Sequence, residues 1–166
     1  MGKTVETLAD LLRPGLSAVV VGINPAPKSV AAGHYYQGAS GQRFFARLAR
    51  VELLPDGEGF EDDRAFAAGI GFTDVVKRPT PSAGDLRPGE LEHGRQIMEA
   101  KLAALEVPLI IFTFKGAATA LLGRFDGHGS LGRRRLAGAK IFVMPGPMEN
   151  RERVDAALAQ LKRLTR

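Results

Sequence analysis

The sequence has 166 residues, of which 45% are hydrophobic, and 23 Lys and Arg residues against 18 Asp and Glu residues give a formal net charge of +5. Cysteine is absent, which excludes disulfide frameworks, thiolate nucleophiles, Cys-type zinc sites and thiolate-held iron–sulfur clusters. No apolar run reaches the roughly 18 residues of a membrane span, and the N-terminus lacks the features of a secretory signal. We therefore expect one domain over residues 1–166, in the cytoplasm, with a polyanionic partner as a reasonable consequence of the basic charge.

The first half of the chain alternates helical and strand patterns. Apolar residues at helical spacing predict a short helix over 4–12, and the continuous apolar run 16–21 predicts a strand covered on both faces. Residues 26–41 read as irregular. Helical spacing returns over 42–54 and for a turn or two over 62–68.

The second half continues this alternation. In order, it predicts a short strand at 69–76, a long helix at 88–105, a buried strand at 108–114, a helix opening at Lys115, a Gly- and Arg-rich loop, a last strand at 140–144 and a final helix from near Glu149 to Leu164. The pattern is typical of an α/β three-layer sandwich with a mostly parallel central sheet. Ligands bind beyond the carboxyl ends of the strands in such sheets, so the site should lie where the four strand exits meet.

An unusual turn, GINPAP, follows the first strand. Gly22 lets the backbone approach a ligand, and Pro25 and Pro27 stiffen the chain, so Asn24 is presented in a fixed orientation. An amide accepts with its oxygen and donates with its nitrogen, which suits it to position a water molecule. The alternative is an Asn–Pro turn with purely local hydrogen bonds.

Several motifs, taken in order, resemble one known family. GINPAPKSVAAGHYY, GQRFFARL, GFTDVVKRPTPSAGDL and FTFKGAA are similar to successive blocks of the mismatch-specific uracil-DNA glycosylase and thymine-DNA glycosylase family, part of the uracil-DNA glycosylase superfamily. VMPGPMENR stands where that family has its DNA intercalation loop. The resemblance covers most of the chain from Leu16 onward.

The resemblance implies a specific reaction. It implies flipping of uracil, or of another damaged pyrimidine, out of mismatched duplex DNA and hydrolysis of its N-glycosidic bond in base excision repair, which leaves an abasic site. Asn24 would orient the attacking water. No cofactor or metal is expected, and the chain is expected to act as a monomer. The implied substrate contacts are the backbone of Gly22 and Ile23, Tyr36 as the stacking ring, Tyr35 as its competitor because the loop is one residue longer here, and Phe45.

Asp74 is a second catalytic candidate. It ends a predicted strand at a position where the family has amide or basic residues. A carboxylate there could take a proton from water or stabilise positive charge on the sugar. The alternative is a capping or ion-pair residue, and either tyrosine could equally be a partly buried loop anchor.

Ten residues are candidate DNA contacts through phosphate binding or wedging: Lys77, Ser82, Lys115, Gly116, Gly146, Pro147, Met148, Glu149, Asn150 and Arg151. Met148 is the most apolar wedge candidate, with Glu149 and Asn150 as competitors. Lys115-Gly116 could equally be an ordinary helix start and Ser82 part of a surface turn. His34 and His93 show no metal-ligand spacing with acidic residues.

Two departures from the family pattern keep a second function open. Ala26 replaces the usual glycine after Asn-Pro, and Gly146 stands where relatives carry a polar side chain. These changes are compatible with a catalytically weak nucleic-acid-binding domain on the same fold. A nucleotide-binding enzyme is disfavoured, because neither GxGxxG nor GxxxxGK[ST] follows a strand.

Overall fold

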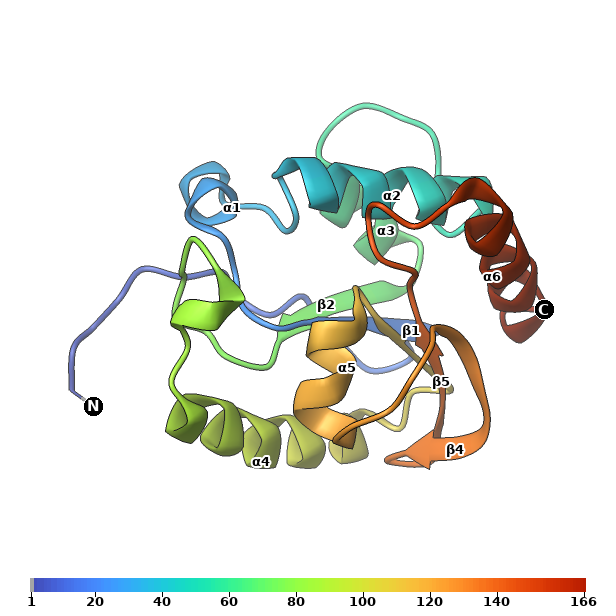
Figure 1. Ribbon diagram of the computed structural model, residues 1–166. Coiled ribbons are helices and arrows are strands. Elements are labelled where there is room, and N and C mark those ends of the chain that lie inside the picture. Colours follow the sequence, from blue (N-terminus) through green and yellow to red (C-terminus); the bar gives the residue numbers. More distant parts are fainter. Residues whose placement is uncertain (1) are drawn as a thin grey trace.

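A computed structural model describes residues 2–166, and in it a five-stranded sheet lies between two layers of helices (Figure 1). The strand order is β2-β1-β3-β5-β4, with β4 antiparallel to β5 and the other pairs parallel. This confirms the predicted mostly parallel α/β architecture.

The elements in chain order are β1 (Ala18–Gly22), α1 (Pro27–Ala32), α2 (Ala39–Arg50), α3 (Glu61–Ala67), β2 (Ile70–Asp74), the 3₁₀ turn η1 (Ala83–Asp85), α4 (Pro88–Leu105), β3 (Leu109–Phe112), α5 (Lys115–Leu122), β4 (Gly129–Leu136), β5 (Ala139–Val143) and α6 (Arg151–Leu164).

Strand β1 is buried on both faces, as its continuous apolar run predicts. Ala18 and Val20 point into the core formed with α2, α3 and α6, whereas Val19 and Val21 point into the core formed with α4 and α5. Successive side chains of a strand point to opposite faces, so one pentapeptide serves both cores. The helices that pack on the two faces hold the sheet in place, and they thereby position the strand ends that carry the site.

The predicted helix over residues 4–12 is wrong. No helix forms over these residues, and Leu11 forms an isolated antiparallel bridge to Phe72 with two backbone hydrogen bonds of 2.9 and 3.0 Å. β2 is the outer strand of the sheet, and its free edge supplies these bonds to the incoming chain. Tertiary pairing therefore overrides a helical pattern too short to be stable alone.

Two further expectations need correction. Residues 26–41 are not wholly irregular, since α1 begins at Pro27 and α2 at Ala39. Proline suits the first helical position because its N–H would have no intrahelical partner there. The Gly- and Arg-rich loop contains β4, an edge strand whose exposed arginines hide the strand signal.

The remaining elements lie close to their predicted positions. α4 has the predicted bounds, and α6 begins after Asn150, whose side chain accepts a hydrogen bond from Arg153 N at 2.9 Å as an N-cap. Within the described part of the chain, no helix has the length and hydropathy to cross a membrane.

Candidate active site

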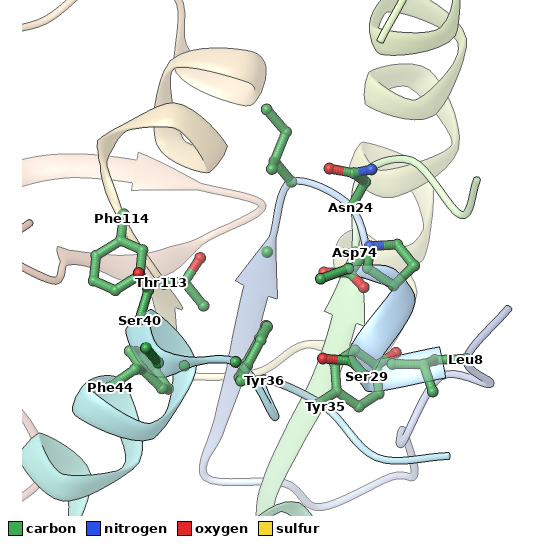
Figure 2. Close-up of a pocket in the computed structure, with 17 residues that line it drawn as sticks. Leu8, Asn24, Ser29, Tyr35, Tyr36, Ser40, Phe44, Asp74, Thr113 and Phe114 are labelled. Atoms are coloured by element: carbon green, nitrogen blue, oxygen red, sulfur yellow. The ribbon is translucent and has the colours of Figure 1, made fainter. Parts of the chain in front are cut away.

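A cavity of about 340 Å³ lies at the carboxyl ends of the parallel strands (Figure 2). It is lined by the exits of β1 (residues 22–26), β2 (Asp74) and β3 (Thr113 and Phe114), together with the Tyr35–Tyr36 loop and the start of α2. Its volume is at the small end of the range for ligand pockets, and its lining is largely apolar and aromatic. Three of the four strand exits therefore meet at one pocket, while the exit of β5 lies outside it.

Asn24 lies on the pocket wall with its amide orientation fixed. Its Nδ2 donates to the backbone oxygen of Arg78 at 3.0 Å and to Thr80 Oγ1 at 2.7 Å. The Thr80 hydroxyl in turn donates to Ser82 O at 2.6 Å, so it can only accept from the amide. Because both partners are acceptors, they must face the amide nitrogen, and the amide oxygen therefore lies on the side of the pocket (Figure 2).

Asp74 is buried, with 1% of its surface exposed, at the end of β2. Neither carboxylate oxygen has a hydrogen-bond partner among residues 2–166. The pKa of Asp74 is raised to about 7, because burial and the charge of Asp10 outweigh the lowering effects of Lys77 and Lys101. A carboxyl group in this condition exchanges a proton near neutral pH, as a general base must.

The two tyrosines of the loop have different environments. Tyr35 is held by its hydroxyl, which donates to Ala9 O at 3.0 Å, and by its backbone N–H, which donates to Asp62 Oδ2 at 2.8 Å. The Tyr36 hydroxyl is buried without a partner in the described chain, and burial raises its pKa well above the usual value. The Tyr36 ring packs on Phe44 with centroids 5.5 Å apart, and it lines the pocket. Tyr35 is thus anchored at its hydroxyl and its backbone N–H, and both tyrosines line the pocket.

Gly22 is required by close packing. A Cβ on Gly22 would overlap Asp74 Oδ1 and lie 2.9 Å from Tyr36 Oη. The strand register pairs Gly22 directly with Asp74. Backbone hydrogen bonds from Val75 N to Gly22 O and from Val76 N to Ile23 O, at 2.9 and 2.8 Å, extend the pairing and hold the GIN turn rigid.

The loop after β5 is held by two arginines of α2. Arg47 is buried and donates to Pro145 O at 2.5 Å and to Gly146 O at 3.1 Å. Arg43 donates to Pro147 O at 2.8 Å. Met148 projects from this loop with 82% of its surface exposed.

Several other predicted contacts have structural partners of their own. Lys77 pairs with Asp10 at 2.7 Å, and the Ser82 hydroxyl accepts from Gly84 N at 3.2 Å as the cap of η1. Phe45 is 1% exposed and lies in the core behind Tyr36 rather than on the pocket lining.

The contacts predicted at the starts of α5 and α6 lie at the same end of the sheet. Lys115 and Arg151 are exposed there, and Gly116 is exposed beside Lys115. Glu149 accepts from Asn150 N at 3.0 Å.

His34 does lie near acidic residues, contrary to the expectation from spacing. Its Nδ1 is 2.9 Å from Asp62 Oδ1 and 3.7 Å from Asp63 Oδ2. Asp62 also accepts from the backbone N–H of Tyr35 and of Asp63, at 2.8 and 3.0 Å. Through these hydrogen bonds, the cluster of His34, Asp62 and Asp63 anchors the Tyr35–Tyr36 loop.

Sequence reasoning missed part of the pocket. Ser29, Ser40, Phe44, Thr113 and Phe114 line it and were not predicted. The strand-end rule could have found Thr113 and Phe114, since they directly follow β3. Phe44 and Phe45 are adjacent on one helix, and only packing decides which of them faces the pocket.

Fold and site together define an α/β protein with a ligand pocket at the carboxyl ends of its parallel strands. The profile of the uracil DNA glycosylase superfamily matches residues 9–155, and the chain belongs to this superfamily.

Two known proteins are similar to this chain. A G/U mismatch-specific uracil DNA glycosylase of Schizosaccharomyces pombe is 34% identical over 101 residues, which is 59% of this chain and 31% of that protein. The matched part is therefore less than a third of that relative. A solution NMR structure of a Methanosarcina acetivorans protein, proposed to be a uracil DNA glycosylase, has the same fold with a TM-score of 0.62 and 16% identity, over 97% of this chain and 98% of that one.

Proposed function

We propose that this chain, as a monomer and without a cofactor, is a DNA glycosylase that excises uracil, including uracil opposite guanine, and leaves an abasic site. The observation that carries the proposal is the Asn24 amide, whose nitrogen is engaged by Arg78 O and Thr80 so that its oxygen is left to face the pocket. Membership of the superfamily and the similarity to the yeast mismatch enzyme support the same reaction.

The proposed chemistry is a displacement by water at the anomeric carbon. Asn24 Oδ1 accepts a hydrogen bond from the water, the water oxygen bonds to the sugar carbon, and the C–N bond electrons leave with the pyrimidine. The proton of the water passes to the ionised form of Asp74, which is present in about half of the molecules near pH 7 because the pKa of Asp74 is about 7. Fixed dipoles around the site lower the barrier to this charge separation.

The proposed substrate is a base turned out of duplex DNA, because the pocket is a recess that a stacked base cannot enter. Tyr36 would stack on the flipped ring, and the backbone of Gly22 and Ile23 would contact its polar edge. Met148 would fill the space left in the duplex, since it is exposed on a loop held against α2.

The test is an excision assay with metal removed. The protein is incubated in EDTA with a duplex carrying one U·G pair, and abasic sites are detected as alkali-labile breaks. We expect breaks with the wild-type chain and a loss of about 10²-fold or more with Asn24→Ala, the range typical of lost transition-state positioning.

The alternative of a catalytically weak nucleic-acid-binding domain makes a different prediction. In that case the duplex binds but no breaks form, and Asn24→Ala behaves as the wild type. That result would overturn the glycosylase proposal.

A further inference from the structure

Three buried polar atoms of the pocket lack hydrogen-bond partners within residues 2–166: Tyr36 Oη, Asp74 Oδ1 and Asp74 Oδ2. Leaving buried polar groups unpaired is costly, so such groups usually have a partner or a function. They are also gathered at one place. The point where Gly22 would carry a Cβ is in contact with Asp74 Oδ1 and 2.9 Å from Tyr36 Oη.

The bare Cα of Gly22 therefore lets both oxygens approach the same side of residue 22. A hydrogen bond between oxygens spans about 2.8 Å, so a rotation of either side chain can bring the Tyr36 hydroxyl to the Asp74 carboxyl. A hydroxyl is both donor and acceptor, whereas an ionised carboxylate only accepts. The proton of such a hydrogen bond must then run from Tyr36 toward Asp74.

We propose that the Tyr36 hydroxyl is a positioning group for Asp74 and donates a hydrogen bond to its carboxylate. The remaining carboxylate oxygen is thereby aimed at the water beside Asn24. Tyr36 then has two separable roles, since its ring lines the base pocket and its hydroxyl acts on Asp74. This inference rests on the proposed glycosylase function for its catalytic meaning.

Three charged residues also act on the pKa of Asp74, and the effect of the Tyr36 hydroxyl has to be separated from theirs. Asp10 comes from the N-terminal segment, Lys77 from the chain after β2, and Lys101 from α4, and all three act on Asp74 by charge. Asp10 pairs with Lys77 at 2.7 Å and with Lys101 at 2.5 Å, so these charges largely offset one another. Tyr36 is the neutral donor beside the carboxyl and can be removed without changing this balance.

The test is Tyr36→Phe, which keeps the ring and removes only the hydroxyl. A hydrogen bond to the ionised form lowers a pKa, so its loss raises the pKa of Asp74 above about 7. The acidic limb of the single-turnover pH profile should move up by about one pH unit, so that the loss of rate relative to the wild type is about tenfold larger at pH 6 than at pH 9. An unmoved limb would overturn the proposal.

Tyr35→Phe is the matched control. The Tyr35 hydroxyl donates to Ala9 O at 3.0 Å and accepts from Lys77 Nζ at 3.4 Å, and Lys77 keeps its pairing with Asp10 without it, so its removal should leave the acidic limb in place whatever its effect on the rate. If both variants moved the limb equally, a general loosening of the loop would explain the result and the specific role of Tyr36 would be rejected.

A second measurement does not depend on excision. The carboxyl carbon of Asp74 is titrated by NMR in the DNA-free wild type and in Tyr36→Phe. We expect a higher midpoint in the variant by about one pH unit. Equal midpoints would refute the inference even if the wild type were active, whereas a raised midpoint in a protein without excision would uphold the coupling and refute only the proposed function.

Discussion

At the scale of single residues, Asp74 is held where folding opposes its ionisation. It is buried without a hydrogen-bond partner among residues 2–166, and its pKa is about 7 instead of the usual 3.8. A carboxylate placed only for structure would be paired, as Asp10 is with Lys77 and Lys101. Strained or unsatisfied groups concentrate at functional sites, and that is the reading we give to Asp74.

Asp74→Asn should therefore lose activity and gain stability together. Excision should fall about 10²-fold or more at unchanged duplex affinity. Because the folded protein holds the proton more tightly than the unfolded chain, wild-type stability falls as pH rises from about 4 to about 7, by up to about 4 kcal/mol, and stays level above. Urea unfolding at pH 5 and pH 8 should show this slope in the wild type and not in the variant.

Two results would contradict this prediction. An unchanged single-turnover rate would remove the catalytic role of Asp74, and an identical pH slope in both proteins would show that the carboxyl is not buried as described.

At the scale of elements, helix α2 joins the pocket to the loop over residues 145–148. Its first turn and Phe44 line the pocket, and Arg43 and Arg47, one turn apart, hold the carbonyl groups of the loop. A base in the pocket and a wedge in the duplex would thus be supported by one rigid element, which reduces the entropy lost on binding.

Met148→Ala and Arg47→Ala should both impair excision from duplex DNA more than from single strands. The wedge is needed only where a base pair must be opened, and Arg47 presents the wedge. Arg50→Ala is the control, since Arg50 lies on the same helix but pairs with the exposed Asp155 at 2.5 Å. Single-turnover rates on matched duplex and single-stranded substrates measure the effect, and equal losses on the two substrates would reject the wedge.

At the scale of the whole molecule, the basic charge is not confined to the pocket end. Arg133, Arg134 and Arg135 are exposed on β4, and Arg135 pairs in register with Lys140 at the start of β5. That is the end of the sheet opposite the pocket, because the pocket lies at the carboxyl ends of the parallel strands. These arginines give the edge strand a charge that discourages pairing with other chains.

We predict that charge matters for DNA affinity only at the pocket end. Replacing Lys115 and Arg151 by Gln should weaken duplex binding and reduce the salt slope of log K by up to about 2, as expected for two lost phosphate contacts. Replacing the three arginines of β4 by Gln should leave that slope within about 0.5 of the wild type. Fluorescence anisotropy across a salt series measures both, and the reverse ranking would place the DNA on the other end of the sheet.

The sequence by itself determined the four parallel strands of the sheet, most of the helices and the rigid turn at Asn24. These follow from local causes, since an apolar pentapeptide such as β1 must be buried on both faces and Gly and Pro restrict the turn whatever surrounds it. The tertiary structure decided the rest. Residues 4–12 did not form a helix because Leu11 bridges to the free edge of β2, and Arg78 and Thr80, 54 and 56 residues away, set the orientation of the Asn24 amide. The meeting of Tyr36 and Asp74 over Gly22 also depends on contacts between distant segments, which no local pattern of residues encodes.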